Sequence, residues 1–177
     1  GGTGLIGKFL IDSLLEKGEI IRAIFRKSSG SSLNNHSHIQ WVDGDVLDFE
    51  AMNKAFEGVK KVYHSAAVVT FDPSLKDLMY KVNIEGTANI VNLCLLHNVE
   101  KLCYVSSVAA LTGNHKIVPI NENSGQPPST QDSHYGITKY YSELEVWRGI
   151  AEGLKAVIVN PSFILGQGDW NKSSTQL

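Results

Sequence analysis

The sequence predicts an α/β fold built on a doubly wound parallel sheet. Three observations support this class. The chain opens on a glycine-rich stretch, Gly1–Gly7, that leads directly into apolar residues at helical spacing. Short apolar runs of strand length then alternate with longer helical patterns. Ser106 and Asn160 each follow such a run, so polar groups are expected where the strands end.

The elements can be assigned in order. We expect strands over residues 19–25, 39–42, 59–65, 101–106 and 156–159, and helices over 4–17, 48–57, 75–97 and 134–152. Gly18 is placed to end the first helix, and Asp48 is a suitable N-cap for the second. Residues 26–38 and 111–133 are expected to be irregular. Because strands and helices alternate, right-handed crossovers are expected to connect parallel strands.

Both ends of the sequence look cut. A phosphate-binding glycine turn follows a strand, yet nothing precedes Gly1. We therefore expect a strand of about 5–6 residues upstream, at the centre of the sheet, and its absence would split the sheet. The polar stretch 171–177 closes no element, so a further region is expected downstream.

Composition narrows the class of protein. The 177 residues fit one domain with a sizeable core. The net charge of -2 offers no basic excess for nucleic acid, and no apolar run is long enough for a membrane span. Cys94 and Cys103 lack metal-type spacing and are expected to be buried free thiols, which fits a reducing cytoplasm. His36 and His38 are interpreted as solvated, so no metal site is expected.

The opening glycines predict a phosphate site. Free amides and the dipole at a helix start favour an anion, and glycine lets the main chain approach it closely. Gly2, Gly4 and Gly7 match G-x-G-x-x-G, whereas Gly1, Gly4 and Gly7 match G-x-x-G-x-x-G. Both readings stay open, and a plain capping loop is the structural alternative.

Two further pairs of residues could contact a bound dinucleotide. Arg26 and Lys27 follow the strand expected over 19–25, about 20 residues after the glycines, where an acid selects NAD and a cation accommodates the 2′-phosphate of NADP. The pair favours NADP, against the alternative of a solvated basic turn. Asp45 and Val46 follow the next strand and would contact the adenine amine and ring, with an Asx turn as the alternative.

Tyr135 and Lys139 are the strongest catalytic candidates. They are four residues apart on a predicted helix and so share one face. The lysine charge is expected to lower the tyrosine pKa and make the phenol a general acid or base. Ser106 and Ser107, at the end of the preceding strand, would place a hydroxyl beside a substrate oxygen. A surface Tyr/Lys pair is the structural alternative.

Together these motifs resemble the extended short-chain dehydrogenase/reductase family of NAD(P)-dependent epimerases, dehydratases and reductases. The resemblance covers nearly the whole chain. The matching segments are Gly1–Gly7, Gly44–Val46, Val62–Ala67, Val82–Thr87, Val105–Ser107, Tyr135 with Lys139, and Asn160–Gly166.

The resemblance implies a Rossmann-type NAD(P)-binding domain over 1–177, without the family's small C-terminal substrate domain. Tyr135 would exchange a proton with a hydroxyl or carbonyl oxygen, Lys139 would hold the nicotinamide ribose, and Ser107, with Ser106 as the fallback, would orient a small-molecule substrate. The cofactor contacts that it implies are Gly1, Thr3, Gly4, Leu5, Ile6, Gly7, Asp45, Val46, Ser65, Ala66, Ala67, Asn83, Tyr135, Lys139, Pro161 and Ser162, with Arg26 and Lys27 at the ribose of NADP.

The surrounding residues narrow the subgroup. Ser107-Val108-Ala109 replaces the Thr-Asp-Glu of sugar dehydratases, and the chain looks most like the dihydroflavonol-reductase and 3β-hydroxysteroid-dehydrogenase branch. A nucleotide-sugar epimerase with tightly held NAD and a non-catalytic dinucleotide sensor are the alternatives. The helices near 75–97 and 134–152 would form a homodimer interface as in relatives, unless their apolar residues all face the sheet.

Overall fold

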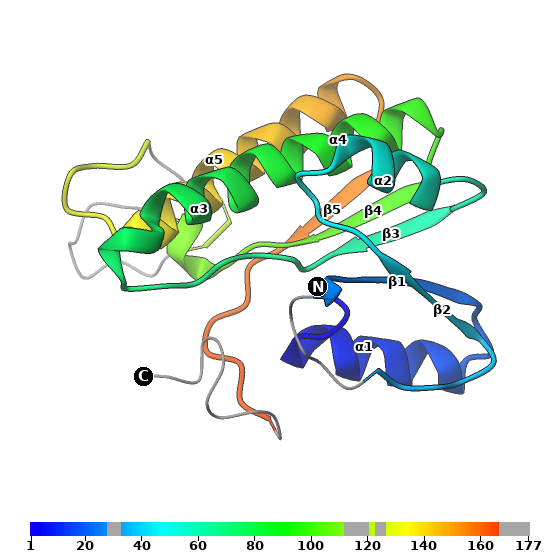
Figure 1. The fold of residues 1–177 in the computed structure, drawn as a ribbon. Helices are drawn as coiled ribbons and strands as arrows, with labels where there is room; N and C mark the ends of the chain where they lie inside the picture. The colour runs from blue at the N-terminus through cyan, green and yellow to red at the C-terminus, as the bar shows by residue number, and fades with distance from the viewer. Residues whose placement is uncertain (28–32, 112–120, 123–126, 167–177) are drawn as a thin grey trace.

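The computed structural model describes residues 1–27, 33–111, 121–122 and 127–166. Most of the predicted irregular segment over 111–133, and the end of the chain over 167–177, lie outside these described residues. Figure 1 shows the arrangement, with strands in a central layer and helices on both sides of it.

The strands form two parallel sheets. β1 (Ile21–Phe25) pairs with β2 (Ile39–Asp43), and β4 (Lys101–Val105) lies between β3 (Lys61–His64) and β5 (Ala156–Val159). All five strands were predicted within two residues at either end. β1 and β3 are not hydrogen-bonded to each other, so the strands form two sheets, as expected.

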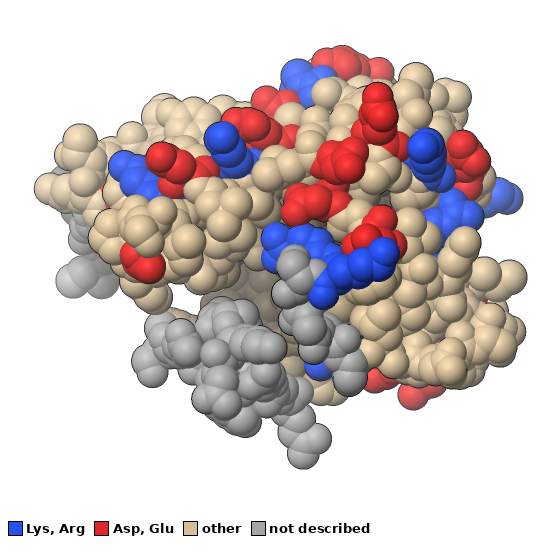
Figure 2. All heavy atoms as spheres, viewed as in Figure 1, with Lys and Arg blue, Asp and Glu red and all other residues tan. Residues whose placement is uncertain are grey.

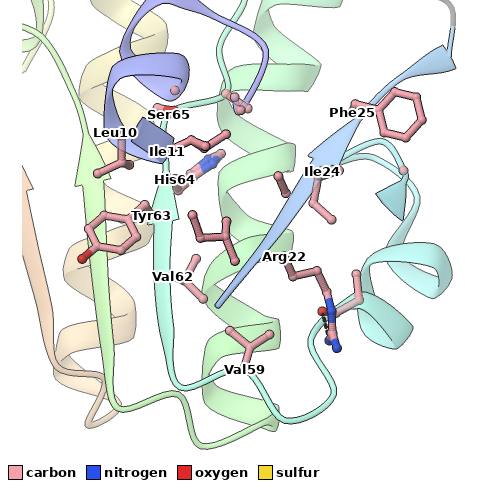
Figure 3. A pocket seen from close by; sticks show the side chains of 18 of the residues that line it. Leu10, Ile11, Arg22, Ile24, Phe25, Val59, Val62, Tyr63, His64 and Ser65 are labelled. Carbon is pink, nitrogen blue, oxygen red and sulfur yellow. Dashed lines mark hydrogen bonds between the residues drawn. The ribbon is translucent and has the colours of Figure 1, made fainter. Parts of the chain in front are cut away.

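A cavity of about 840 Å³ lies between β1 and β3. Figure 3 shows Ile24 of β1, Val62 of β3 and Ile11 of the first helix lining it, with His64 and Ser65 at one end. Its lining is largely apolar along the middle of the strands, with Arg22 and Lys61 toward their amino ends and His64 and Ser65 at the carboxyl end of β3.

The helices confirm most of the sequence-based assignments. α1 (Leu5–Glu16) lies on the opposite side of the strands from α4 (Gly86–Leu96) and α5 (His134–Ala151) (Figure 1). In α2 (Phe49–Ala55), the carboxylate of Asp48 accepts a hydrogen bond from the backbone amide of Ala51 over 3.0 Å. Gly18, with φ +74°, follows α1 as predicted.

The helix predicted over 75–97 is confirmed, but it is not α-helical throughout. The segment comprises a 3₁₀ turn (η2, Pro73–Leu75), a short helix α3 (Lys76–Tyr80), a π-helical segment η3 (Lys81–Glu85) and then α4. Apolar periodicity does not reveal such an insertion. The hydroxyls of Thr87 and Ser142 both bond the carbonyl of Asn83, which lies in the π-helical segment.

The core is formed where α4 and α5 pack on β4. Leu93, Leu102, Tyr104 and Val146 are fully buried there. A Cβ at Gly149 would lie only 2.5 Å from Val91 Cγ1, so glycine allows α5 to approach α4.

Three further observations concern surface charge, helix length and possible metal ligands. Acidic and basic side chains are interspersed on the face shown in Figure 2. Among the described residues, no helix combines the length and the apolar character needed to cross a bilayer, and no cluster of three or more His, Cys, Asp or Glu side chains has the arrangement of a metal site.

Candidate active site

The glycine turn is tightly packed at two of its four glycines. A Cβ on Gly1 would lie 2.5 Å from the carbonyl carbon of Ser65, and one on Gly7 would lie 2.7 Å from Gly2 Cα and would clash with the Gly1 carbonyl oxygen. A Cβ on Gly2 would meet only side-chain atoms at 3.4 Å or beyond. The structure therefore favours the reading with Gly1, Gly4 and Gly7.

The start of α1 is open to a ligand. Gly4 is the N-cap, so no side chain accepts the first amides of the helix. Thr3 precedes Gly4 in the turn. Leu5 and Ile6 begin the helix and line an apolar hollow of about 500 Å³ together with Val105 and Pro161. This end of α1 has the free amides and the close main-chain approach that a phosphate needs.

The two basic residues after β1 are paired with carboxylates. Arg26 Nη1 lies 3.6 Å from Asp45 Oδ2, and Lys27 Nζ lies 3.3 Å from Asp43 Oδ2. Asp45 Oδ1 also accepts the amide of Leu47 over 3.0 Å, which is the Asx turn of the alternative reading. Both cations are largely exposed. A 2′-phosphate would therefore compete with two carboxylates for these cations.

Val46 packs against α4 and is hydrogen-bonded to it. A Cβ on Gly86 would lie 2.6 Å from Val46 Cγ2, and Asn89 donates a side-chain hydrogen bond to the Val46 carbonyl over 2.9 Å. The turn after β2 is thereby held against the helix that follows β3.

The end of β3 lies against the glycine turn. Ser65, Ala66 and Ala67 line the cavity beside Gly1, as the sequence predicts for a strand end along a cofactor. Asn83, another predicted contact, is buried. It is 1% exposed, and its amide bonds both backbone groups of Val68 and the Thr138 hydroxyl. These bonds fix the loop after β3 to α5.

Ser107 and Tyr135 come together at the carboxyl edge of the sheet. The Ser107 hydroxyl lies beside the Tyr135 phenol and accepts the amide of Ala109 over 3.2 Å. Burial raises the pKa of Tyr135, and the nearby Ser107 hydroxyl opposes that shift. Ser106 is buried, and its hydroxyl has no hydrogen-bond partner within the described part of the chain. Ser107 is therefore the serine beside the tyrosine.

Lys139 lies one helical turn beyond Tyr135, but its electrostatics differ from the prediction. The side chain is 2% exposed, and Nζ donates to Tyr104 OH over 2.6 Å and to the Val105 carbonyl over 2.8 Å. Burial lowers the pKa of Lys139 to about 7. The expected lowering of the Tyr135 pKa is absent, because burial of the phenol dominates.

Sequence reasoning did not predict how Gly136 and Asn160 hold this site. A Cβ on Gly136 would lie 2.6 Å from the Ala109 carbonyl, so glycine lets the start of α5 approach the turn that carries Ser107. Asn160 donates to the Ser107 carbonyl over 3.1 Å and to the Glu143 carboxylate over 2.6 Å. The glycine directly after Tyr135 and the Asn-Pro pair after β5 were the available signals.

The last two predicted contacts follow β5. Pro161 accepts the amide of Val108 through its carbonyl over 3.1 Å, and Ser162 is exposed next to it. The polar ends of all three strands of the larger sheet thus meet at one edge.

Comparison with known proteins identifies the protein family. The model of the NAD-dependent epimerase/dehydratase family matches residues 1–177. The chain belongs to this family. It is 31% identical over 175 residues to a putative dihydroflavonol 4-reductase of Synechocystis, covering 99% of this chain and 51% of that protein. It is 30% identical over 177 residues to a 3-beta-hydroxysteroid dehydrogenase of Mycolicibacterium neoaurum, covering 96% and 47%.

A solved structure agrees with the family assignment. UDP-glucose 4-epimerase from Thermus thermophilus, in complex with NAD, superposes with a TM-score of 0.78 at 26% identity, over 90% of this chain and 52% of that one. The fold is therefore the Rossmann type of the epimerase/dehydratase enzymes, and a nicotinamide dinucleotide is the corresponding cofactor class. The chain spans about half the length of the relatives it matches.

Proposed function

We propose that the full-length protein is an NAD(P)-dependent oxidoreductase that interconverts a carbonyl and a secondary alcohol. The observation that carries this proposal is the placement of Ser107 beside Tyr135, with Lys139 one turn further along α5. A phenol and a hydroxyl that meet at the carboxyl edge of a parallel sheet are placed to bind one substrate oxygen.

Each side chain has a distinct role. Ser107 orients the substrate oxygen, and Tyr135 gives it a proton in reduction or takes one in oxidation. Lys139, charged through part of the neutral range because its pKa is about 7, stabilises the phenolate that reduction leaves on Tyr135. A bound nicotinamide supplies or accepts the hydride.

The residues at the glycine turn fit a dinucleotide. Gly1 and Gly7 leave no room for a Cβ, and the first amides of α1 have no side-chain cap. The amide nitrogens of this turn would hold the pyrophosphate, and Ser65 and Ala66 would flank it.

The test is transfer of a labelled hydride. The full-length protein is incubated with NADPH or NADH deuterated at C4 and with a panel of ketones and aldehydes. Deuterium at the new carbinol carbon, with stoichiometric cofactor oxidation, supports the proposal. Absence of transfer from either face of both cofactors to every carbonyl would reject it.

A nucleotide-sugar epimerase is the second candidate. The pairing of Arg26 and Lys27 with Asp45 and Asp43 favours it, since these carboxylates oppose a 2′-phosphate, and the Thermus thermophilus neighbour is an epimerase in complex with NAD. In that case NAD copurifies with the protein. A nucleotide sugar is then inverted at one carbon without uptake of deuterium from added cofactor.

For the cofactor, we propose a preference for NADP, because Arg26 and Lys27 follow β1, where a cation accommodates a 2′-phosphate. A bound phosphate would take these exposed cations from Asp45 and Asp43. The Arg26→Ala substitution should weaken NADPH binding by about 10- to 100-fold, since a charge-assisted contact to the phosphate is lost. NADH binding should change by less than about threefold. Nicotinamide fluorescence of the full-length protein measures both dissociation constants. Lys17→Ala, which removes another exposed cation at the end of α1, is the matched control. Equal losses for both cofactors would refute the preference.

We further propose that the protein is a cytoplasmic homodimer. Leu78, Leu144 and Trp147 are 42%, 45% and 55% exposed on α3 and α5, so the apolar residues of these helices do not all face the sheet. Cys94 is a buried free thiol, which fits a reducing compartment. Sedimentation of the full-length protein should give twice the mass of one chain, and a monomer at micromolar concentration would exclude the dimer.

A further inference from the structure

A second tyrosine lies behind the Ser107, Tyr135 and Lys139 group. Tyr104 is on β4, three residues before Ser107, and is 1% exposed. Besides the 2.6 Å hydrogen bond to its hydroxyl, Lys139 Nζ lies 4.3 Å from the centroid of the Tyr104 ring. The strand that presents the serine therefore also presents the phenol that contacts the lysine.

Two hydroxyls near Tyr104 are engaged with backbone carbonyls. Thr87 Oγ1 donates to the Asn83 carbonyl over 2.6 Å, and Ser142 Oγ donates its hydrogen to backbone carbonyls at 2.6 and 2.7 Å. A hydroxyl has a single hydrogen, so neither has one left for the Tyr104 oxygen. Within the described residues, the side-chain donor to this oxygen is Lys139 Nζ.

The other groups around Lys139 show why the Tyr104 oxygen matters as an acceptor for the ammonium. Glu143, one turn further along α5, favours the ammonium, but burial outweighs it. His64 on β3 bonds Thr87 Oγ1 over 3.0 Å, and burial, with the charge of Lys139 nearby, lowers its pKa well below the ordinary value. His64 is therefore neutral at physiological pH. The direct acceptors of the Lys139 amine are the Tyr104 oxygen and the Val105 carbonyl.

We propose that Tyr104 is a positioning residue for Lys139, whose phenol oxygen fixes the amine against β4 and stabilises its charged form. The proposal rests on the proposed function, in which Lys139 acts beside Tyr135. Tyr104 and Val105 take two of the three N–H donors of the ammonium. The described residues supply no third acceptor, so one N–H is left for a ligand at the carboxyl edge.

The test measures the protonation of Lys139 directly. In the full-length protein carrying ¹⁵N-labelled lysine side chains, the Nζ resonance is assigned with Lys139→Met and titrated. Tyr104→Phe should lower the Lys139 pKa by about one unit, since the ammonium loses an acceptor while the buried ring remains. Tyr140→Phe, which removes a hydroxyl from the residue after Lys139, is the matched control and should leave the titration unchanged.

Kinetics provide the second measurement. With a carbonyl substrate, Tyr104→Phe should lower kcat by about tenfold at pH 8, leave the substrate KM within about twofold, and move the alkaline limb of the kcat profile to lower pH. In the Lys139→Met background, Tyr104→Phe should have no further effect, because coupled residues are not additive. A purely structural role would lower kcat equally at every pH.

The outcomes separate this inference from the proposed function. An unchanged Lys139 titration and pH profile in Tyr104→Phe, beside an inactive Tyr135→Phe, would overturn the positioning role alone. Full turnover in Tyr135→Phe would overturn the proposed function, whatever the titration shows. If Tyr104→Phe does not fold, 3-fluorotyrosine at position 104 keeps the shape and weakens the acceptor. It should shift the Lys139 titration in the same direction, and no shift would count against the proposal.

Discussion

We expect Tyr135→Phe to lower kcat of the full-length protein by about 100- to 10,000-fold, the usual contribution of a general acid or base. The substitution removes only the phenol oxygen, which the Ser107 hydroxyl contacts. The ring remains half-buried at the start of α5. Cofactor affinity and the thermal unfolding midpoint should therefore stay close to those of the unmodified protein. Steady-state kinetics, fluorescence titration and thermal unfolding measure the three quantities.

The control for this experiment is Tyr140→Phe, which carries the same change five residues further along α5 and should retain full turnover. Unchanged turnover in Tyr135→Phe would show that the phenol is not the proton donor. Tight dinucleotide binding without any turnover in the unmodified protein would instead favour a non-catalytic sensor.

The protonation states at this site favour reduction. Burial raises the pKa of Tyr135, so the phenol carries its proton at neutral pH and can donate it to a carbonyl. Because a raised phenol pKa keeps the acid form present to higher pH, proton donation is lost only as the pH rises through that pKa. Lys139, with a pKa lowered to about 7, loses its charge at lower pH than an ordinary lysine. A bound dinucleotide brings negative charge and would favour the ammonium.

Local signals in the sequence were sufficient for most of the fold. Alternating apolar runs located all five strands, and Asp48 was recognised as an N-cap because a carboxylate before a helical pattern accepts the amides of its first turn. Spacing along α5 was enough to place Tyr135 and Lys139 one turn apart. These features depend on residues close together in the chain.

Features that depend on distant contacts could not be predicted in the same way. The π-helical segment at Asn83 is tied to Ser142, 59 positions away. The tyrosine that contacts Lys139 comes from β4, 35 positions earlier. A sequence pattern placed Lys139 on the correct face of α5, but only packing shows that burial, rather than its charge, sets the pKa of Tyr135.

A second large effect is expected from a substitution in the glycine turn, on both cofactor binding and stability. Gly7→Ala should weaken binding of NADPH and NADH by at least about tenfold, and overpacking of this kind destabilises a fold by about 1–3 kcal/mol. The new Cβ would clash with the Gly1 carbonyl oxygen and lie 2.7 Å from Gly2 Cα. Both obstacles are backbone atoms, so relief requires the turn itself to move away from the position that binds phosphate. Fluorescence titration and thermal unfolding of the full-length protein test both effects.

Gly2→Ala is the matched control, because it makes the same substitution within the same turn. Its Cβ would meet side-chain atoms of Trp41, Ala23 and Ile11 at 3.4–3.5 Å, which is ordinary packing distance. Cofactor affinity should therefore stay within about twofold of the unmodified protein. The reverse pattern, with Gly2→Ala harmful and Gly7→Ala tolerated, would contradict the packing seen here. Since the two readings of the motif differ only in whether Gly1 or Gly2 comes first, a harmful Gly2→Ala would restore the G-x-G-x-x-G reading.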